Sequence, residues 1–124
     1  MSNCVFCNIE TERILNKYNY FITFRDLYPV TDLHTLIVPK RHAVSYFELR
    51  DDELIELAKI IKYQKNELTN LDKTISGFNI GMNIGEDAGQ TVFHCHVHII
   101  PRRKGDVKNP RGGIRGVIPD KKSY

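Results

Sequence analysis

Residues 93–99 read Phe-His-Cys-His-Val-His-Ile, so three histidines stand at alternate positions with apolar residues between them. In a β-strand, side chains at positions i and i+2 share a face and are separated by roughly 6.5 Å of rise. The alternation therefore predicts a strand that turns His94, His96 and His98 to one side and the apolar residues, Phe93 included, into the core. Three of the protein's five histidines lie in this one segment, which argues against a chance arrangement on a solvent face.

Other segments carry their own periodicities. Residues 18–26, 34–39 and 77–85 alternate or are rich in β-branched residues, so we expect strands there. In the last of these segments, the residues expected to face inward are Phe78, Ile80, Met82 and Ile84. Residues 51–71 instead repeat apolar side chains at spacings of three and four, which indicates an amphipathic helix with an acidic start suited to its cap and dipole. The pattern predicts an α+β fold with an antiparallel sheet of about five strands.

Length and composition limit the classes of protein that need to be considered. The 124 residues predict a single domain, with a core at about 4–106 and a basic tail, rich in Gly and Pro, at 107–124. A formal net charge of +3 is too small to indicate a nucleic-acid partner, and no apolar run approaches the roughly 20 residues of a membrane span. Three cysteines are an odd number, and the first ten residues lack a signal-peptide pattern, so we expect a reducing, cytoplasmic location.

The three histidines are compatible with more than one chemistry. Two of them could share a metal ion, but three along one strand span too far to converge easily on a tetrahedral ion. A mixed cluster is the better interpretation, in which one imidazole is a ligand and the others do chemistry. Crowded imidazoles disfavour charge on one another, which predicts that the middle one, His96, is neutral and nucleophilic.

The segment before the histidines, residues 85–91, reads Gly-Glu-Asp-Ala-Gly-Gln-Thr. A plain hairpin turn would account for it. Glycines also let the backbone approach an anion, however, and Gln90 and Thr91 add donors for its oxygens. Beside three histidines, this composition favours a phosphate site.

Residues 94–100, His-Cys-His-Val-His-Ile-Ile, resemble the His-x-His-x-His-x-x signature of the histidine triad (HIT) superfamily, in which x is apolar. The chain is most similar to the branch that holds the Hint and Fhit proteins and to bacterial-type members. The resemblance extends to residues 24–42, 79–94 and 98–106 and covers roughly 4–106. It implies a HIT-like fold with one long helix and a short one. It also implies a two-fold homodimer with the long helix at or near the interface.

The resemblance also implies an enzyme, a nucleotide hydrolase or nucleotidyl transferase that acts at an α-phosphate through a nucleotidyl-histidine intermediate. His96 would be the nucleophile, His98 would orient the site and help the leaving group depart, and His34 would tune both. Asp26 would hold the ribose hydroxyls. The residues that would contact the α-phosphate are Asn83, Gln90 and Thr91, together with His98. No catalytic metal is required in this scheme.

Cys4 and Cys7 form a Cys-x-x-Cys pair. By themselves they could be unremarkable thiols, a redox dithiol without the usual βαβ context, or half of a zinc site. The resemblance supplies the other half, because His42 and His94 match the remaining ligands of a closed, structural zinc site. Cys95 is predicted to be a small apolar filler of the core.

The substrate is the least constrained inference. The chain beyond the triad is strongly basic, carrying Arg102, Arg103, Lys104, Lys108, Arg111, Arg115, Lys121 and Lys122. If this tail folds over the cleft, its charge favours a polyphosphate leaving group and hence dinucleoside polyphosphates such as diadenosine tetraphosphate. The alternatives are a Hint-like purine nucleoside phosphoramidase, a non-catalytic nucleotide-binding module and a zinc-linked nucleic-acid binder. The chain has no tryptophan, whereas Hint proteins close their site with one, so their substrate preference does not transfer.

Overall fold

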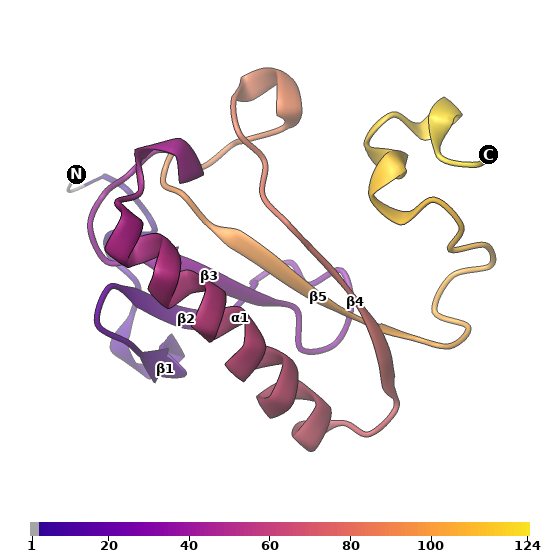
Figure 1. Cartoon of the computed structure of the whole chain (residues 1–124), viewed down its shortest axis with the longest axis horizontal. Helices are drawn as coiled ribbons and strands as arrows, with labels where there is room; N and C mark the ends of the chain where they lie inside the picture. The colour runs from indigo at the N-terminus through magenta and orange to yellow at the C-terminus, as the bar shows by residue number, and fades with distance from the viewer. Residues whose placement is uncertain (1–2) are drawn as a thin grey trace.

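The computed structural model describes residues 3–124 and is built on one five-stranded antiparallel sheet (Figure 1). The strands follow the order β1-β2-β3-β5-β4. Their bounds are Asn16–Lys17 (β1), Phe21–Arg25 (β2), Thr35–Pro39 (β3), Ile75–Gly81 (β4) and Val97–Arg103 (β5). Every neighbouring pair runs antiparallel, which confirms the predicted α+β class.

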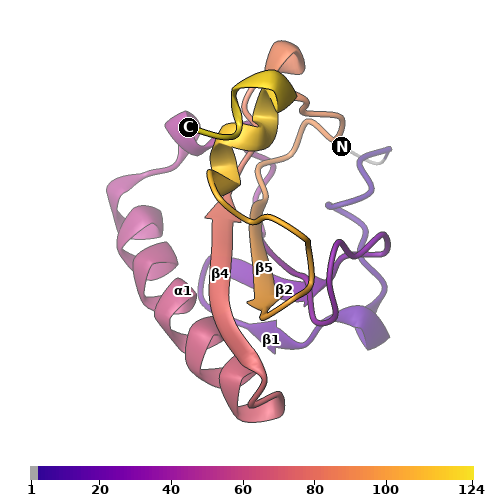
Figure 2. The same ribbon diagram turned by 90° about the vertical axis from the view of Figure 1, so that its right-hand side faces the viewer.

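The long helix, α1, spans Asp51–Leu71, as its apolar spacing predicts. It packs across one face of the sheet and buries Leu57, Ile60 and Leu68 there (Figure 2). The residue at the N-cap is Arg50, whose backbone N–H donates to the Glu53 carboxylate at 2.8 Å, so the acidic first turn stabilises the helix start from within. In place of a short second α-helix, the described chain has 3-10 turns at Thr11–Arg13, Tyr46–Glu48, Glu86–Ala88, Gly113–Val117 and Pro119–Lys121.

The sheet is covered on both faces. The helix side holds the larger cluster, to which β2, β3 and β5 contribute Phe21, Ile37, Val97 and Ile99. On the opposite face, a second cluster of Ile22, Phe24, Leu36 and Val38 packs against Phe6, Ile9 and Ile14 of the N-terminal segment. Cys95, Val97 and Ile99 of the histidine segment therefore face the helix, and the N-terminal segment covers the other face.

Two sequence-based expectations of burial are wrong. Ile80 is 42% exposed because β4 is an edge strand of the sheet, although Phe78 and Met82 of the same segment do pack against the core. Phe93 is 46% exposed because β5 begins only at Val97, so the chain at Phe93 is not yet part of the sheet. The histidine segment is therefore a strand only at its last member, His98.

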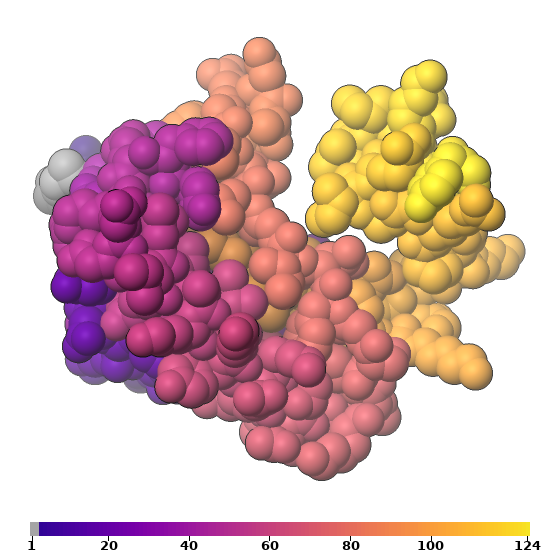
Figure 3. Space-filling view, in the orientation of Figure 1, coloured from indigo at the N-terminus to yellow at the C-terminus, as the bar shows by residue number. Residues whose placement is uncertain are grey.

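The tail, residues 107–124, leaves β5 and turns back beside β4 (Figures 1 and 2). In the space-filling view it stands as a lobe separated by an open cleft from the segment that follows β4 (Figure 3). Within residues 3–124, no helix combines the length and the apolar character needed to cross a membrane.

Candidate active site and metal centre

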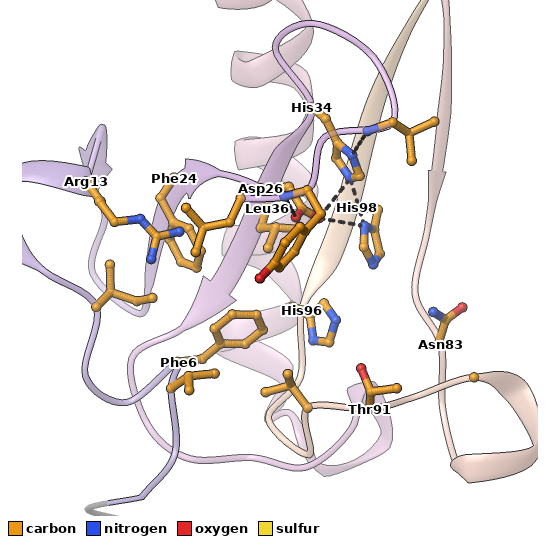
Figure 4. A pocket seen from close by; sticks show the side chains of 17 residues that line it. Phe6, Arg13, Phe24, Asp26, His34, Leu36, Asn83, Thr91, His96 and His98 are labelled. Carbon is orange, nitrogen blue, oxygen red and sulfur yellow. Dashed lines mark hydrogen bonds and ion pairs between the residues drawn. The ribbon is translucent and has the colours of Figure 1, made fainter.

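A cavity of about 530 Å³ lies on the sheet face opposite α1, where the histidine segment enters β5 (Figure 4). We call it the triad cavity. The residues that line it are Val5, Phe6, Ile9, Arg13, Phe24, Asp26, Leu27, Tyr28, Val30, His34, Leu36, Asn83, Gly89, Thr91, Val92, His96 and His98. It therefore brings together all the predicted catalytic histidines and most of the predicted substrate-binding residues. Its apolar end, formed around Phe6 and Phe24, could not be located from the sequence patterns.

The His96 ring is held in place by the backbone oxygen of His94 and the ring of Phe6. Its Nδ1 lies 2.8 Å from the backbone oxygen of His94. A carbonyl oxygen only accepts, so Nδ1 carries the proton and donates it, which leaves the Nε2 lone pair directed elsewhere. Phe6 packs edge-on against the same ring at a centroid distance of 4.9 Å. Figure 4 shows Phe6 on one side of His96 and Asn83 and Thr91 on the other, so Nε2 is available to a group that enters the triad cavity.

A chain of hydrogen bonds determines where His34 and His98 carry their protons. The Val30 backbone N–H donates to His34 Nδ1 at 3.0 Å, so the proton of a neutral His34 is on Nε2. That Nε2–H faces His98 Nδ1 at 2.9 Å, which in turn leaves the His98 proton on its own Nε2. Burial lowers the pKa of His34, and burial reinforced by the neighbouring His96 and His34 lowers the pKa of His98 to about 4. Both rings are therefore neutral near pH 7, and His98 presents an N–H donor.

Asp26 lies at the end of this chain. Its Oδ2 is 3.5 Å from His34 Nε2 and 3.9 Å from His98 Nδ1, and its Oδ1 accepts the Tyr28 backbone N–H at 2.8 Å. The carboxylate is thus anchored by the loop after β2 while it still borders the triad cavity. Asp26 and His34 therefore support one another rather than pointing independently into solvent.

The segment after β4 divides the predicted phosphate-binding residues into two groups. Asn83 and Thr91 are exposed and line the triad cavity. Gln90 is only 4% exposed and does not line it. Its Oε1 accepts the Gly85 N–H at 2.9 Å, and its Nε2 donates to the backbone oxygens of Val44 and Val92 at 2.9 and 3.2 Å. In this arrangement the Gln90 amide holds the loop, and its contact with an anion stays a prediction.

The predicted zinc ligands converge on one point. The ligand atoms of Cys4, Cys7, His42 and His94 all lie within 4.8 Å of one another. The sulfur–nitrogen separations are 3.4 Å for Cys4 to His94, 3.5 Å for Cys7 to His94 and 3.2 Å for Cys7 to His42. Ordinary Zn–S and Zn–N bonds at a tetrahedral angle require sulfur and nitrogen to be about 3.6 Å apart.

The surroundings of His94 favour the same metal. His94 is fully buried, and its Nε2–H donates to the backbone oxygen of Pro39 at 2.8 Å, which turns Nδ1 toward the two sulfurs. Such a second hydrogen bond is the usual way in which a ligating imidazole is oriented. Burial lowers the pKa of His94, which keeps it in the neutral form that ligates. Two thiols and two imidazoles fit zinc.

Phe6 joins the metal centre to the cavity. It lies between Cys4 and Cys7 in the sequence and packs edge-on against Phe24 at 5.6 Å and against His96 at 4.9 Å. Sequence reasoning gave Phe6 no role, although its place inside the Cys-x-x-Cys pair was the available signal. The same short loop thus supplies two thiols to one site and an aromatic wall to the other.

The basic tail does not take the place expected of it. The Arg102 guanidinium pairs with Asp106 at 2.8 Å, and Arg103 pairs with Asp72 at 2.9 Å. Arg111 and Arg115 both lie over the Tyr124 ring. In the described chain, none of the basic residues from Arg102 onward lines the triad cavity. The condition on which tail charge would favour a polyphosphate, that the tail folds over this cleft, is therefore not met in the described chain.

Comparison with known proteins places the chain in a family. The HIT domain model matches residues 8–105, and the chain belongs to the HIT family. An uncharacterized HIT-like protein of Methanocaldococcus jannaschii is 41% identical over 107 residues, which are 83% of this chain and 81% of that protein. An adenosine 5′-monophosphoramidase of Candida albicans is 30% identical over 110 residues, covering 82% and 72% of the two chains.

Solved structures of other HIT proteins have a similar fold. A Zn-bound histidine triad family protein from Mycobacterium smegmatis superposes with a TM-score of 0.77 at 31% identity, covering 87% of this chain and 81% of that one. The diadenosine triphosphate hydrolase of Plasmodium falciparum superposes with a TM-score of 0.75 at 29% identity, covering 82% and 68%. The fold is thus that of a HIT protein, as the sequence resemblance implied.

Proposed function

We propose that the protein is a nucleotide hydrolase that transfers a nucleotidyl group to His96 and then to water. The observation that carries the proposal is the pair of ring positions left for substrate, a lone pair on His96 Nε2 and an N–H on His98 Nε2. They lie on neighbouring rings, 5.2 Å apart between centroids, in one cavity. The names of the Candida albicans and Plasmodium falciparum relatives support a reaction at phosphorus.

The first step forms one bond and breaks another. His96 Nε2 attacks the α-phosphorus, a P–N bond forms, and the bond from phosphorus to the leaving group breaks with its electrons on that group. The ring then carries positive charge, which the His94 carbonyl stabilises because it accepts the Nδ1–H. His98 donates its Nε2–H toward the departing atom, and Asn83 and Thr91 hold the phosphoryl oxygens.

In the second step, the oxygen of a water molecule attacks phosphorus, the P–N bond breaks with its electrons on His96, and the attacking water releases its proton to the solvent. The product is a nucleoside monophosphate. Asp26 is positioned to hold the ribose, and the apolar end of the triad cavity near Phe6 and Phe24 accepts the base. Gln90 acts indirectly, by keeping the loop that carries Thr91 in place.

Zinc has a structural part in this scheme. When bound, it cross-links the N-terminal segment to the histidine segment and leaves no open coordination position, because four protein ligands complete a tetrahedral site. Cys4, Cys7, His42 and His94 would hold it. The chain's own side chains perform every bond-forming and bond-breaking step.

We further propose that the protein acts in the cytoplasm as a homodimer. The exposed edge of β4 offers unpaired backbone groups. On α1, Ile55 and Tyr63 are exposed at 61% and 59%. An interface that joins these surfaces would cover both.

An adenosine phosphoramidate is the second candidate substrate. The basic tail residues do not line the triad cavity, and Arg13 is the single Lys or Arg among its described lining residues, so that cavity offers little positive charge to a polyphosphate leaving group. The Candida albicans relative is named as a phosphoramidase. The first candidate, a dinucleoside polyphosphate, and the phosphoramidate would both form the same nucleotidyl-histidine intermediate.

Trapping that intermediate tests the proposal. Wild-type protein, quenched during turnover of a slow adenylate, should carry one nucleotidyl group on His96 by peptide mass spectrometry. His96→Ala should lose both the label and the turnover while it keeps its fold and metal content. Phe93→Ala is the matched control, because Phe93 is a neighbouring exposed side chain that does not line the cavity. Turnover that persists in His96→Ala would make the protein a nucleotide-binding module with chemistry elsewhere.

A further inference from the structure

A second cavity, of about 320 Å³, lies between β4 and the tail. We call it the tail cavity. Its walls are apolar side chains from both sides, namely Ile80, Met82 and Ile100 from the sheet region and Ile114 and Val117 from the tail. Figure 3 shows the cleft beside the tail lobe, and Figure 2 shows the tail lying against the end of β4. Its volume is at the low end of the roughly 300–1,000 Å³ of small-molecule sites.

The tail cavity adjoins the triad cavity at the reacting groups. Val30, His34, Asn83 and His98 line both cavities, whereas His96 lines only the triad cavity. His98 therefore forms part of the boundary between them. A group that passes from one cavity to the other passes the Nε2–H donor of this ring.

The displacement geometry assigns a direction to each part of the substrate. Transfer to His96 is in line, so the leaving group departs on the side of phosphorus opposite His96 Nε2. The nucleoside that becomes attached occupies the triad cavity. The space that adjoins His98 and lacks His96 is the tail cavity, which places the departing group there.

We propose that the tail cavity binds the departing nucleoside of a dinucleoside polyphosphate, an inference that rests on the proposed function. The base would lie between the aliphatic side chains of β4 and those of the tail. Asn79 would face its polar edge, because Arg102 Nη1 occupies the Asn79 Oδ1 at 2.7 Å and leaves the amide N–H groups as donors. The tail thus contributes shape to substrate choice rather than charge.

The protonation of His98 agrees with this substrate class. A phosphate leaving group departs as an anion and needs a hydrogen-bond donor, which neutral His98 provides through Nε2–H. An amine leaving group must take up a proton, and burial disfavours the charged form of His98 that would carry it. With a dinucleoside polyphosphate, the bond that breaks would be a phosphoanhydride, and the second nucleoside would depart with its remaining phosphates into the tail cavity.

Gly81 offers a way to fill the tail cavity. A Cβ at this position would stand 4.0 Å from Ile114 Cδ1, so a branched side chain would project toward the tail wall. Valine is favoured in strands, and Gly81 lies in β4 outside the lining of the triad cavity. Ser76→Val is the matched control, because Ser76 is an exposed residue of the same strand that lines neither cavity.

The experiment measures equilibrium binding of diadenosine tetraphosphate and of AMP by calorimetry, in a His96→Ala background that prevents turnover. We expect Gly81→Val to raise the Kd for diadenosine tetraphosphate by about tenfold, the order expected when one base loses its packing surface, with the Kd for AMP unchanged. Ser76→Val should change neither. Equal Kd values for diadenosine tetraphosphate with and without Gly81→Val, or equal losses for both ligands, would overturn the inference.

This readout is independent of the chemistry of His96. Absence of the labelled intermediate in wild-type protein would refute the proposed function even if Gly81→Val selectively weakens diadenosine tetraphosphate. An intermediate that forms, together with binding that is insensitive to Gly81→Val, would refute only the tail cavity as a nucleoside site.

Discussion

Gln90 provides the sharpest test of how the candidate site is supported. Its buried amide makes three hydrogen bonds, to the Gly85 N–H and to the oxygens of Val44 and Val92. Gln90→Met keeps the length of the side chain and removes all three. At about 1 kcal/mol for each bond, the loss is about 3 kcal/mol, a large part of the roughly 5–15 kcal/mol that stabilises a small domain.

The assay is urea denaturation of the nucleotide-free protein, followed by AMP binding to the folded variants. Gln90→Met should lower the free energy of unfolding by about 3 kcal/mol and weaken AMP binding as a consequence. Thr91→Val is the control, because Thr91 is exposed in the triad cavity and should weaken binding without changing stability. A Gln90→Met protein of wild-type stability that fails to bind AMP would show that the amide contacts phosphate directly.

The remaining predictions concern the zinc content, the stability at acid pH and the oligomeric state. Replacing Cys4 and Cys7 by Ser should remove about one zinc ion per chain in elemental analysis and lower Tm, whereas unchanged zinc would contradict the four-residue site. The folded pKa of His98, about 4, lies below its ordinary 6.5, so the unfolded chain protonates first and stability is lost as the pH falls between these values. The loss should reach about 3 kcal/mol at pH 4, and a His98→Gln protein with an equal slope between pH 6.5 and 4 would refute the cause. Light scattering should give twice the chain mass at micromolar concentration and a monomer mass for Ile55→Lys; a wild-type monomer would exclude the dimer.

The parts of the fold that could be predicted are those that depend on residues close together in the sequence. The helix at 51–71 was predicted with its ends, because apolar spacing and acidic first-turn residues act within the element itself. The alternation of apolar residues and histidines predicted that the Cys95 side chain faces away from those of its histidine neighbours. Cys95 is 3% exposed and packs on the helix side. The metal-binding set came from residue chemistry together with the family resemblance, and the structure brings all four residues together.

The parts that could not be predicted depend on distant partners. The donors of Gln90 looked available for an anion because nothing local reveals that the oxygen of Val44, 46 positions away, accepts one of them. Ile80 looked buried because a period of two does not say which strand is at the edge of the sheet. Leu33 has a φ of 71°, a conformation that costs a non-glycine residue energy, and only the turn that positions His34 explains it. The basic tail was judged by its charge, whereas its aliphatic side chains line the cavity that it helps to form.

The loop that carries Phe6 has a consequence for the order in which the protein is assembled. Cys4 is separated from His94 by 90 positions, so on the ribosome the N-terminal segment emerges long before the residue to which it attaches. Closing a loop of this length costs about 4 kcal/mol of chain entropy, which a metal-bound cross-link can offset only once both ends exist. The wall that Phe6 gives the triad cavity is therefore fixed only after the histidine segment has emerged. We expect a nascent chain that already has α1 and four strands to remain unable to hold a nucleotide until the histidine segment is released.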